Sequence, residues 1–188
     1  KGSGIDQLSI EFPIQHIKAL LVTHCHIDHV GRIPYLMAAG FDGPIYCTVP
    51  TAKLLPLVLE DAVKIGFTKN KQLINKFLKV LANRMVAVPY GQWQKIALPE
   101  SKNQLKIKFK PAGHILGSAY IECETNQQQI TFSGDLGGPY TPLLPNPKPP
   151  YKTDVLVLES TYGDKNHVNR KERKTQLKKL IIRCLQNK

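Results

Sequence analysis

The sequence predicts a mixed α/β fold, and two kinds of pattern support this class. Short aliphatic runs of strand length occur at residues 19–23, 130–132 and 155–158, and each leads directly into polar residues. Two longer segments, at about 51–65 and 71–84, repeat apolar residues at helical spacing. At 188 residues, the chain is long enough to bury the core of one ordinary domain.

The first half of the chain is predicted to alternate strands and helices. Residues 19–23 (Ala-Leu-Leu-Val-Thr) are expected to form a buried strand. The segment from His29 to Ala39 is expected to form a helix that ends at Gly40. A strand at 45–48 follows it.

Two longer helices are predicted next. Thr51 is expected to cap a helix that runs toward Ile65, and a second helix covers about Lys71 to Arg84. We assign no function to Trp93, because a lone tryptophan is more often a core anchor than a stacking platform.

The second half is predicted to be rich in strands. Four are expected, at 105–109, 120–124, 130–132 and 155–158. In the first of them, apolar residues alternate with lysines, which is typical of a half-buried strand with a basic outer face. The last, Val155 to Leu158, is expected to be buried. From Lys171 onward, apolar residues mark one face of an amphipathic helix whose other face is basic.

Residues 24–29 (His-Cys-His-Ile-Asp-His) place three imidazoles and one carboxylate directly after the first predicted strand. The carboxyl end of a strand is where α/β proteins carry their chemistry. His24 and His26 project to the same side of an extended backbone. Asp28 and His29 follow as the chain turns, so they need not point to the same place as the first pair. Two ligand pairs that point in different directions can hold two metal ions side by side.

An isolated histidine is more often structural than functional, but these histidines are not isolated. Four of the six, at positions 24, 26, 29 and 114, fall within motif-like segments. Packing gains nothing from clustering groups that are costly to desolvate, so we interpret the cluster as a metal site. Cys25 is interpreted as a small buried residue between two ligands, not as a ligand itself.

Four segments, taken in order, resemble the motifs of the metallo-β-lactamase superfamily. They are residues 24–29, 112–119 (Ala-Gly-His-Ile-Leu-Gly-Ser-Ala), 132–137 (Phe-Ser-Gly-Asp-Leu-Gly) and 158–164 (Leu-Glu-Ser-Thr-Tyr-Gly-Asp). The last of them resembles the acidic motif that opens the β-CASP domain of the members that process nucleic acids. It separates this subgroup from the β-lactamases and the thioesterases. The resemblance spans about residues 18 to 167.

The resemblance implies the αβ/βα sandwich of that superfamily, truncated at both ends in this chain. Residues 1–160 would form an incomplete metallo-β-lactamase core, and residues 161–188 would begin an incomplete β-CASP domain. It also implies six metal ligands: His24, His26 and His114 for one zinc ion, Asp28 and His29 for a second, and Asp135 bridging the two.

The reaction that the resemblance implies is hydrolysis of phosphodiester bonds in RNA by a hydroxide that two metal ions activate. The chain would then belong to an endo- or exoribonuclease. Asp28 is expected to orient the attacking hydroxide. Glu159 is expected to help position a histidine that protonates the leaving oxygen, although the same residue alone would serve equally well as a strand-end carboxylate. His167 resembles a further local feature of the family and is more often structural.

The family also has a supporting acidic residue before the first motif and a metal-binding histidine after the β-CASP insertion, and both lie outside this sequence. The resemblance therefore implies one nearly complete zinc site and one deficient site. We expect the chain by itself to bind zinc more tightly at the His24 site than at the His29 site, and to have little nuclease activity.

The charge of the chain favours an anionic partner. The 26 basic and 14 acidic side chains give a net charge of +12, of which +7 lies between residues 164 and 188. Single-stranded RNA is the partner we expect. The apolar stripe of the 171–188 helix is expected to self-associate or to pack against a missing domain.

Cysteine usage and hydropathy indicate in which cellular compartment the protein is expected. The four cysteines are scattered and do not resemble a disulfide framework, so we expect a cytoplasmic protein. No apolar stretch approaches membrane-spanning length, and no membrane partner is expected.

Two other functions remain open from the sequence. A small-molecule hydrolase, acting on a thioester or a lactam, could use the same metal site. A non-catalytic scaffold subunit of an RNA-processing complex is the non-enzyme alternative. The 159–163 motif and the positive charge argue against the first, and the retained ligands argue against the second.

Overall fold

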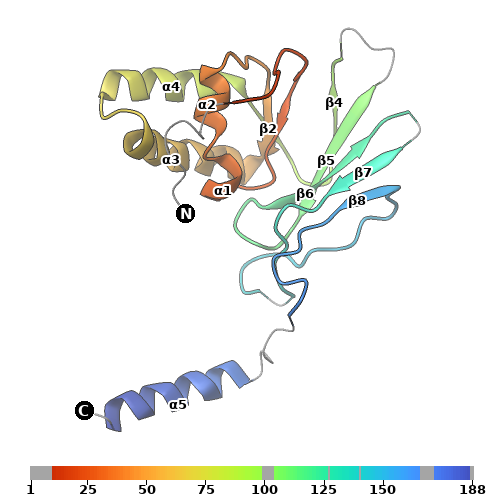
Figure 1. Cartoon of the computed structure of the whole chain (residues 1–188). Helices are drawn as coiled ribbons and strands as arrows, with labels where there is room; N and C mark the ends of the chain where they lie inside the picture. The colour runs from red at the N-terminus through yellow and green to blue at the C-terminus, as the bar shows by residue number, and fades with distance from the viewer. Residues whose placement is uncertain (1–9, 99–103, 127, 140, 166–171, 187–188) are drawn as a thin grey trace. The chain divides into compact units, whose positions relative to one another are not determined.

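The computed structural model describes residues 10–98, 104–126, 128–139, 141–165 and 172–186. The chain divides into two compact units, Lys1–Leu158 and Glu159–Lys188. All strands of the described residues lie in the first unit, which also contains every histidine of the candidate site (Figure 1).

The first sheet is parallel and has three strands, β1 (Leu20–Leu21), β2 (Ile45–Thr48) and β3 (Met85–Val88), in that order. Parallel neighbours need crossover connections, and helices provide them here. The short helices α1 (Ile27–Val30) and α2 (Ile33–Ala38) connect β1 to β2, and the longer helices α3 (Val49–Gly66) and α4 (Lys71–Arg84) connect β2 to β3.

The second sheet has five strands in chain order and is mostly antiparallel. Its strands are β4 (Trp93–Ile96), β5 (Leu105–Pro111), β6 (Ala119–Glu124), β7 (Gln129–Phe132) and β8 (Val155–Val157). The first four form a meander, and β8 then returns parallel to β7 at the edge of the sheet.

Two apolar clusters hold these layers together. Side chains of β2 alternate between them: Ile45 and Cys47 pack with buried residues of α3 and α4, whereas Tyr46 packs with Ile107 and Phe109 of the second sheet. The four helices of this unit lie on the outer side of the first sheet, and the second sheet covers its other side (Figure 1). The layers are therefore helices, sheet and sheet, as the αβ/βα sandwich requires.

Most predicted elements are confirmed, and the helix predicted at 29–39 is wrong in detail. It is two short helices, and the break between them falls at Gly31 and Arg32. Pro34 lies in the first turn of α2, where its missing N–H leaves no intrahelical bond unmade. The cap of α3 was also misplaced: the Thr48 side chain accepts a hydrogen bond from the Thr51 backbone N–H, so Thr48 is the capping residue.

Two predicted burials are also wrong. Val155, Leu156 and Val157 form β8 as predicted, but they are 46–49% exposed, and β8 is an edge strand of its sheet. Trp93 is 40% exposed and is not a core anchor. It stands directly across from Lys108 on β5, whose Nζ lies 4.1 Å from the centre of the ring.

The second unit contains one helix among its described residues, α5 (Arg173–Gln186). It carries five basic and no acidic side chains, and its residues are exposed along its whole length, including the predicted apolar stripe. His167 lies outside the described residues. None of the described helices is both long and apolar enough to cross a membrane.

Candidate metal centre

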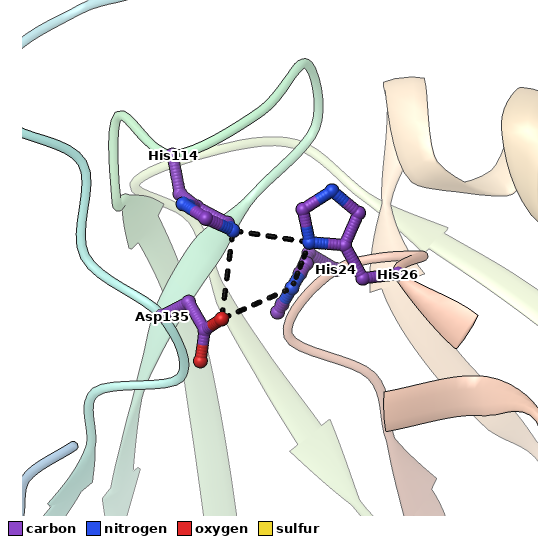
Figure 2. Close-up of side chains that lie close together, drawn as sticks. All are labelled: His24, His26, His114 and Asp135. Carbon is purple, nitrogen blue, oxygen red and sulfur yellow. Dashed lines mark hydrogen bonds and ion pairs between the residues drawn. The ribbon is translucent and has the colours of Figure 1, made fainter. Parts of the chain in front are cut away.

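Three imidazoles and one carboxylate converge in the first unit (Figure 2). His26 Nδ1 lies 3.2 Å from His24 Nε2 and 3.0 Å from His114 Nε2. Asp135 closes the group, because its Oδ2 atom lies 3.8 Å from His24 Nε2 and 3.5 Å from His114 Nε2. One donor atom from each of the four residues lies within 4.8 Å of all the others.

Each of these residues lies on a loop that follows a strand, as the sequence predicts. His24 and His26 come from the extended segment between β1 and α1, His114 from the loop between β5 and β6, and Asp135 from the loop after β7. The backbone at His26 is extended (φ −65°, ψ 146°), which lets its side chain project to the same side as that of His24. Residues up to 111 positions apart, His24 and Asp135, therefore meet at the carboxyl ends of their strands.

His24 is the buried member of the group. The pKa of His24 is lowered from 6.5 to about 4, mainly by burial and then by the nearby His29 imidazole, while the Asp135 carboxylate opposes both. The imidazole is therefore neutral at ordinary pH, which is the form that binds metals. Thr23 Oγ1 lies 3.1 Å from His24 Nδ1 and fixes that side of the ring, so Nε2 is left to face the cluster.

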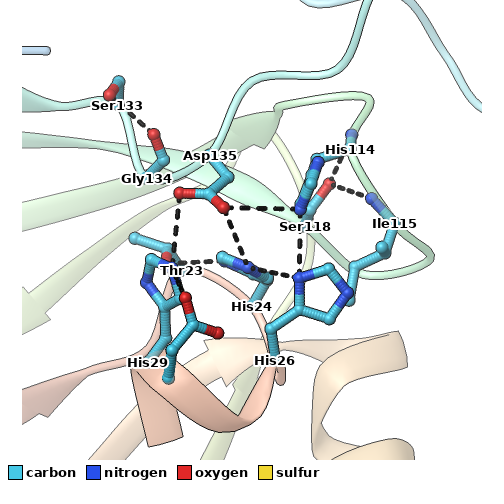
Figure 3. Close-up of polar contacts among 11 residues, drawn as sticks. Thr23, His24, His26, His29, His114, Ile115, Ser118, Ser133, Gly134 and Asp135 are labelled. Carbon is cyan, nitrogen blue, oxygen red and sulfur yellow. Dashed lines mark hydrogen bonds and ion pairs between the residues drawn. The ribbon is translucent and has the colours of Figure 1, made fainter. Parts of the chain in front are cut away.

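Asp28 and His29, the two predicted ligands of the second ion, occupy α1. His29 Nε2 lies 3.3 Å from Asp135 Oδ1, as Figure 3 shows. The same nitrogen lies 3.4 Å from Asp28 Oδ2. The side chain of Asp28 is 73% exposed and that of His29 is 30% exposed, so this end of the cluster opens to solvent. The structure thus gathers four of the six predicted ligands in one group and places His29 beside it, between Asp135 and Asp28.

Two other residues of the predicted motifs, Cys25 and Glu159, are not among the six predicted ligands. Cys25 is 5% exposed and packs in the apolar cluster beneath the first sheet, and burial raises the pKa of its thiol. It is therefore a buried filler, as the sequence indicates. Glu159 is the first residue of the second unit, and its catalytic role stays a prediction.

The donor set fits a metal ion. Three of the closest contacts join ring nitrogens to one another or to a carboxylate, and at least one ring is buried and neutral. Lone pairs that face each other in this way are repulsive unless a proton or a cation lies between them. A cation that prefers imidazole and carboxylate ligands would satisfy all four donors at once.

Several supporting residues were not predicted from the sequence. Thr23 contacts His24, Ser118 binds the backbone at His114, and two buried threonines contact the same loop at Gly117. Ser118 lies inside a recognised motif, but hydroxyl residues at strand ends are too common for their spacing to identify them.

Comparison with known proteins now identifies the family. The family model of the metallo-beta-lactamase superfamily matches residues 2–180. This chain belongs to the metallo-β-lactamase superfamily. The membership agrees with the sandwich layers and with the metal-binding character of the histidine cluster.

Individual relatives of this superfamily member are named as ribonucleases or as a transcription termination factor. It is 34% identical over 156 residues to "Ribonuclease TTHA0252" of Thermus thermophilus, a match that covers 83% of this chain and 34% of the relative. It is 35% identical over 158 residues to "Transcription termination factor FttA" of Methanococcus maripaludis, covering 81% of this chain and 24% of the relative. It is 31% identical over 186 residues to "Endoribonuclease YSH1" of Yarrowia lipolytica, covering 95% of this chain and 22% of the relative.

These names agree with the predicted resemblance to the β-CASP subgroup of RNA-processing nucleases. The chain spans about a quarter to a third of the length of the relatives it matches.

Proposed function

We propose that this chain carries the metal-binding part of a zinc-dependent ribonuclease. The observation that supports it most is the His24, His26, His114 and Asp135 cluster, in a chain whose relatives are named as ribonucleases. Imidazole nitrogen and carboxylate oxygen are the ligands that zinc prefers, and an open face is typical of catalytic zinc sites.

Two groups of residues would hold two ions. His24, His26 and His114 would bind the first, Asp28 and His29 the second, and Asp135 would contribute one oxygen to each. Zinc ions bound there would supply Lewis acidity and a water of lowered pKa for hydrolysis of a phosphodiester.

The chain's own residues have three tasks in this reaction. Asp28 is exposed at the open end of the cluster, where its carboxylate can accept a proton from the attacking water and orient it. Thr23 holds the His24 ring in place through Nδ1. Glu159 would act as the second catalytic carboxylate, through a histidine that it orients.

Single-stranded RNA is the substrate class that charge favours. The net charge of +12 attracts a polyanion, and the five basic side chains of α5 add a local site of attraction. We propose that residues 161–188 begin the β-CASP domain and that the apolar stripe of α5 packs against another part of the protein or a second copy. We also propose a cytoplasmic location, because all four cysteines are free.

The test is release of labelled fragments from single-stranded RNA by the intact protein. We expect cleavage that a chelator abolishes and that added zinc restores. Asp28→Asn should lower the rate at least roughly 100-fold, in the range of a lost acid–base group. The matched control is Asp42→Asn, which removes an exposed carboxylate outside the cluster and should leave the rate unchanged. Cleavage that survives the chelator, or equal rates for the two variants, would contradict the proposal.

A further inference from the structure

Two threonines at the start of α3 contact the loop that carries His114. Thr48 Oγ1 lies 2.7 Å from the carbonyl oxygen of Gly117, and Thr51 Oγ1 lies 2.9 Å from the same oxygen. Both threonines are fully buried, and their hydroxyls are 3.0 Å apart. The carbonyl at position 117 is therefore held by a pair of hydroxyl groups from a different layer of the fold.

The backbone at Gly117 is pressed directly against α3. Its φ of +87° favours glycine, and a Cβ atom there would lie 2.5 Å from Thr51 Oγ1 and 2.8 Å from the Thr51 backbone nitrogen. Such distances leave no room for a side chain. The loop and the helix start thus form one close contact, in which hydroxyl groups supply the polar partners.

The next residue, Ser118, connects Gly117 to the backbone of His114. Ser118 is 2% exposed, and its Oγ accepts hydrogen bonds from the backbone N–H groups of His114 (3.0 Å) and Ile115 (3.2 Å), as Figure 3 shows. The Ser118 carbonyl accepts from the hydroxyl of Tyr90 at 3.0 Å. A shift at Gly117 would therefore move the group that holds the His114 backbone.

Helix capping does not explain Thr51. Thr48 Oγ1 alone accepts from the first free backbone N–H of α3, at 3.2 Å from the Thr51 nitrogen. A second hydroxyl buried at this point costs free energy unless it is hydrogen-bonded. Its partners are the Gly117 carbonyl and the Thr48 hydroxyl, so the Thr51 hydroxyl binds the loop that carries His114 and does not cap α3.

We infer that Thr48 and Thr51 are positioning residues for His114. By holding Gly117, they keep Ser118 where its hydroxyl fixes the His114 backbone, with the imidazole facing His26 and Asp135. The inference rests on the proposed metal site for its functional meaning, but the hydrogen-bonded chain from Thr51 to His114 exists without metal.

The test compares Thr51→Val, which keeps the shape and removes the hydroxyl, with Thr51→Ser, which keeps the hydroxyl. The first readout is amide hydrogen exchange of residues 112–118 in the metal-free intact protein. The second is affinity for Co²⁺, with the visible absorption spectrum as a report on ligand geometry. We expect Thr51→Val to speed exchange at His114 and Ile115 and to weaken cobalt binding about 10-fold with an altered spectrum, as loss of an outer ligand contact does. Thr51→Ser should restore both.

Thr131→Val is the matched control for losing a buried threonine hydroxyl. Thr131 is 2% exposed, and its Oγ1 has no hydrogen-bond partner among the described residues, so this variant should change neither readout. Unchanged exchange in Thr51→Val, or a Thr51→Ser variant as impaired as Thr51→Val, would overturn the inference. Absence of cobalt binding by the unsubstituted protein would instead overturn the proposed metal site.

Discussion

His29 Nε2 lies 3.3 Å from Oδ1 of Asp135, on the carboxylate oxygen opposite the one that faces His24 and His114. The two oxygens of one side chain therefore face two different groups of imidazoles. Such an arrangement divides the cluster into two halves that share a single residue. It gives Asp135 a distinct position among the six candidate ligands, because its two oxygens lie against imidazoles of both halves.

Asp135→Asn should weaken metal binding at both halves. An amide is neutral and presents one oxygen in place of two, so neither half keeps its charged ligand. We expect affinity for the tighter ion to fall roughly 10–100-fold and the weaker ion to be lost. Metal analysis after dialysis against zinc buffers measures both. Asp42→Asn, at an exposed position, is the control. Retention of a full second ion would show that Asp135 is not shared.

His24→Ala and His29→Ala should differ in which ion they remove. His24 belongs to the half with three imidazoles and is fully buried, whereas His29 shares its half with only Asp28 and one oxygen of Asp135. Three imidazoles and a carboxylate complete a tetrahedral site. We therefore expect His29→Ala to keep the tighter zinc ion and His24→Ala to lose it. Removal of all zinc by His29→Ala, with none removed by His24→Ala, would reverse the assignment.

The metal-free protein should lose stability in acid because of His24. Its pKa is about 4 in the fold, against 6.5 when exposed, because burial favours the neutral ring. Between pH 6.5 and 4, His24 is protonated in the unfolded state but stays neutral in the folded state. The free energy of unfolding therefore falls as the pH falls from 6.5 to 4. Over this pH range the free energy of unfolding should fall by roughly 3 kcal/mol, because a pKa difference of one between the folded and unfolded states corresponds to about 1.4 kcal/mol.

Urea unfolding of chelator-treated protein at pH 7, 6, 5 and 4.5 measures this loss. His24→Gln should flatten the slope between pH 6.5 and 4, even if its stability at pH 7 is lower. His16→Gln, which removes an exposed histidine, should leave the slope as it is. Equal slopes in all three proteins would contradict the role given to burial at His24.

The sequence predicted which side chains cluster, because each follows a strand within a recognisable motif. The periodicity also located α4 at Lys71–Arg84 with both ends correct. It failed where distant contacts decide the outcome. The strand β3 was missed because it follows α4 with no break between them, and β4 was missed because only two of its four residues, Trp93 and Ile96, are apolar. Thr51 was misread for the same reason: a hydroxyl at the start of a helix predicts a cap, but only the folded chain shows that the Gly117 carbonyl is its partner.

Burial of the edge strand could not be read from composition either. Val155 to Leu158 has the aliphatic content of a core strand, yet the three residues of β8 are about half exposed. Hydropathy shows how much apolar surface a segment could bury. Whether other residues cover that surface depends on where the strand lies in the folded protein.

Gly137→Ala should disrupt the candidate metal centre, although it replaces none of the six candidate ligands. The backbone N–H of Gly137 donates to the Ala112 carbonyl at 2.8 Å, which joins the Asp135 loop to the His114 loop. A Cβ atom at this glycine would fall 1.7 Å from the Gly113 carbonyl oxygen and 2.6 Å from the His114 nitrogen. Since both obstacles are backbone atoms, one loop has to move away from the other. We expect a loss of at least about 2–3 kcal/mol of stability, at the upper end of overpacking costs.

The matched control is Gly66→Ala at the end of α3, where the nearest atom to an added Cβ is the Tyr35 hydroxyl oxygen at 3.6 Å. Alanine fits there and favours the helix, so this variant should be neutral or more stable by up to about 1 kcal/mol. Thermal unfolding of the metal-free proteins measures both changes, and Co²⁺ titration measures the effect on the centre. Because Gly137→Ala separates the loops of Asp135 and His114, it should weaken cobalt binding as well as lower the unfolding temperature, while Gly66→Ala leaves cobalt binding unchanged. If the two glycines tolerated alanine equally, the close approach of the two loops would be wrong.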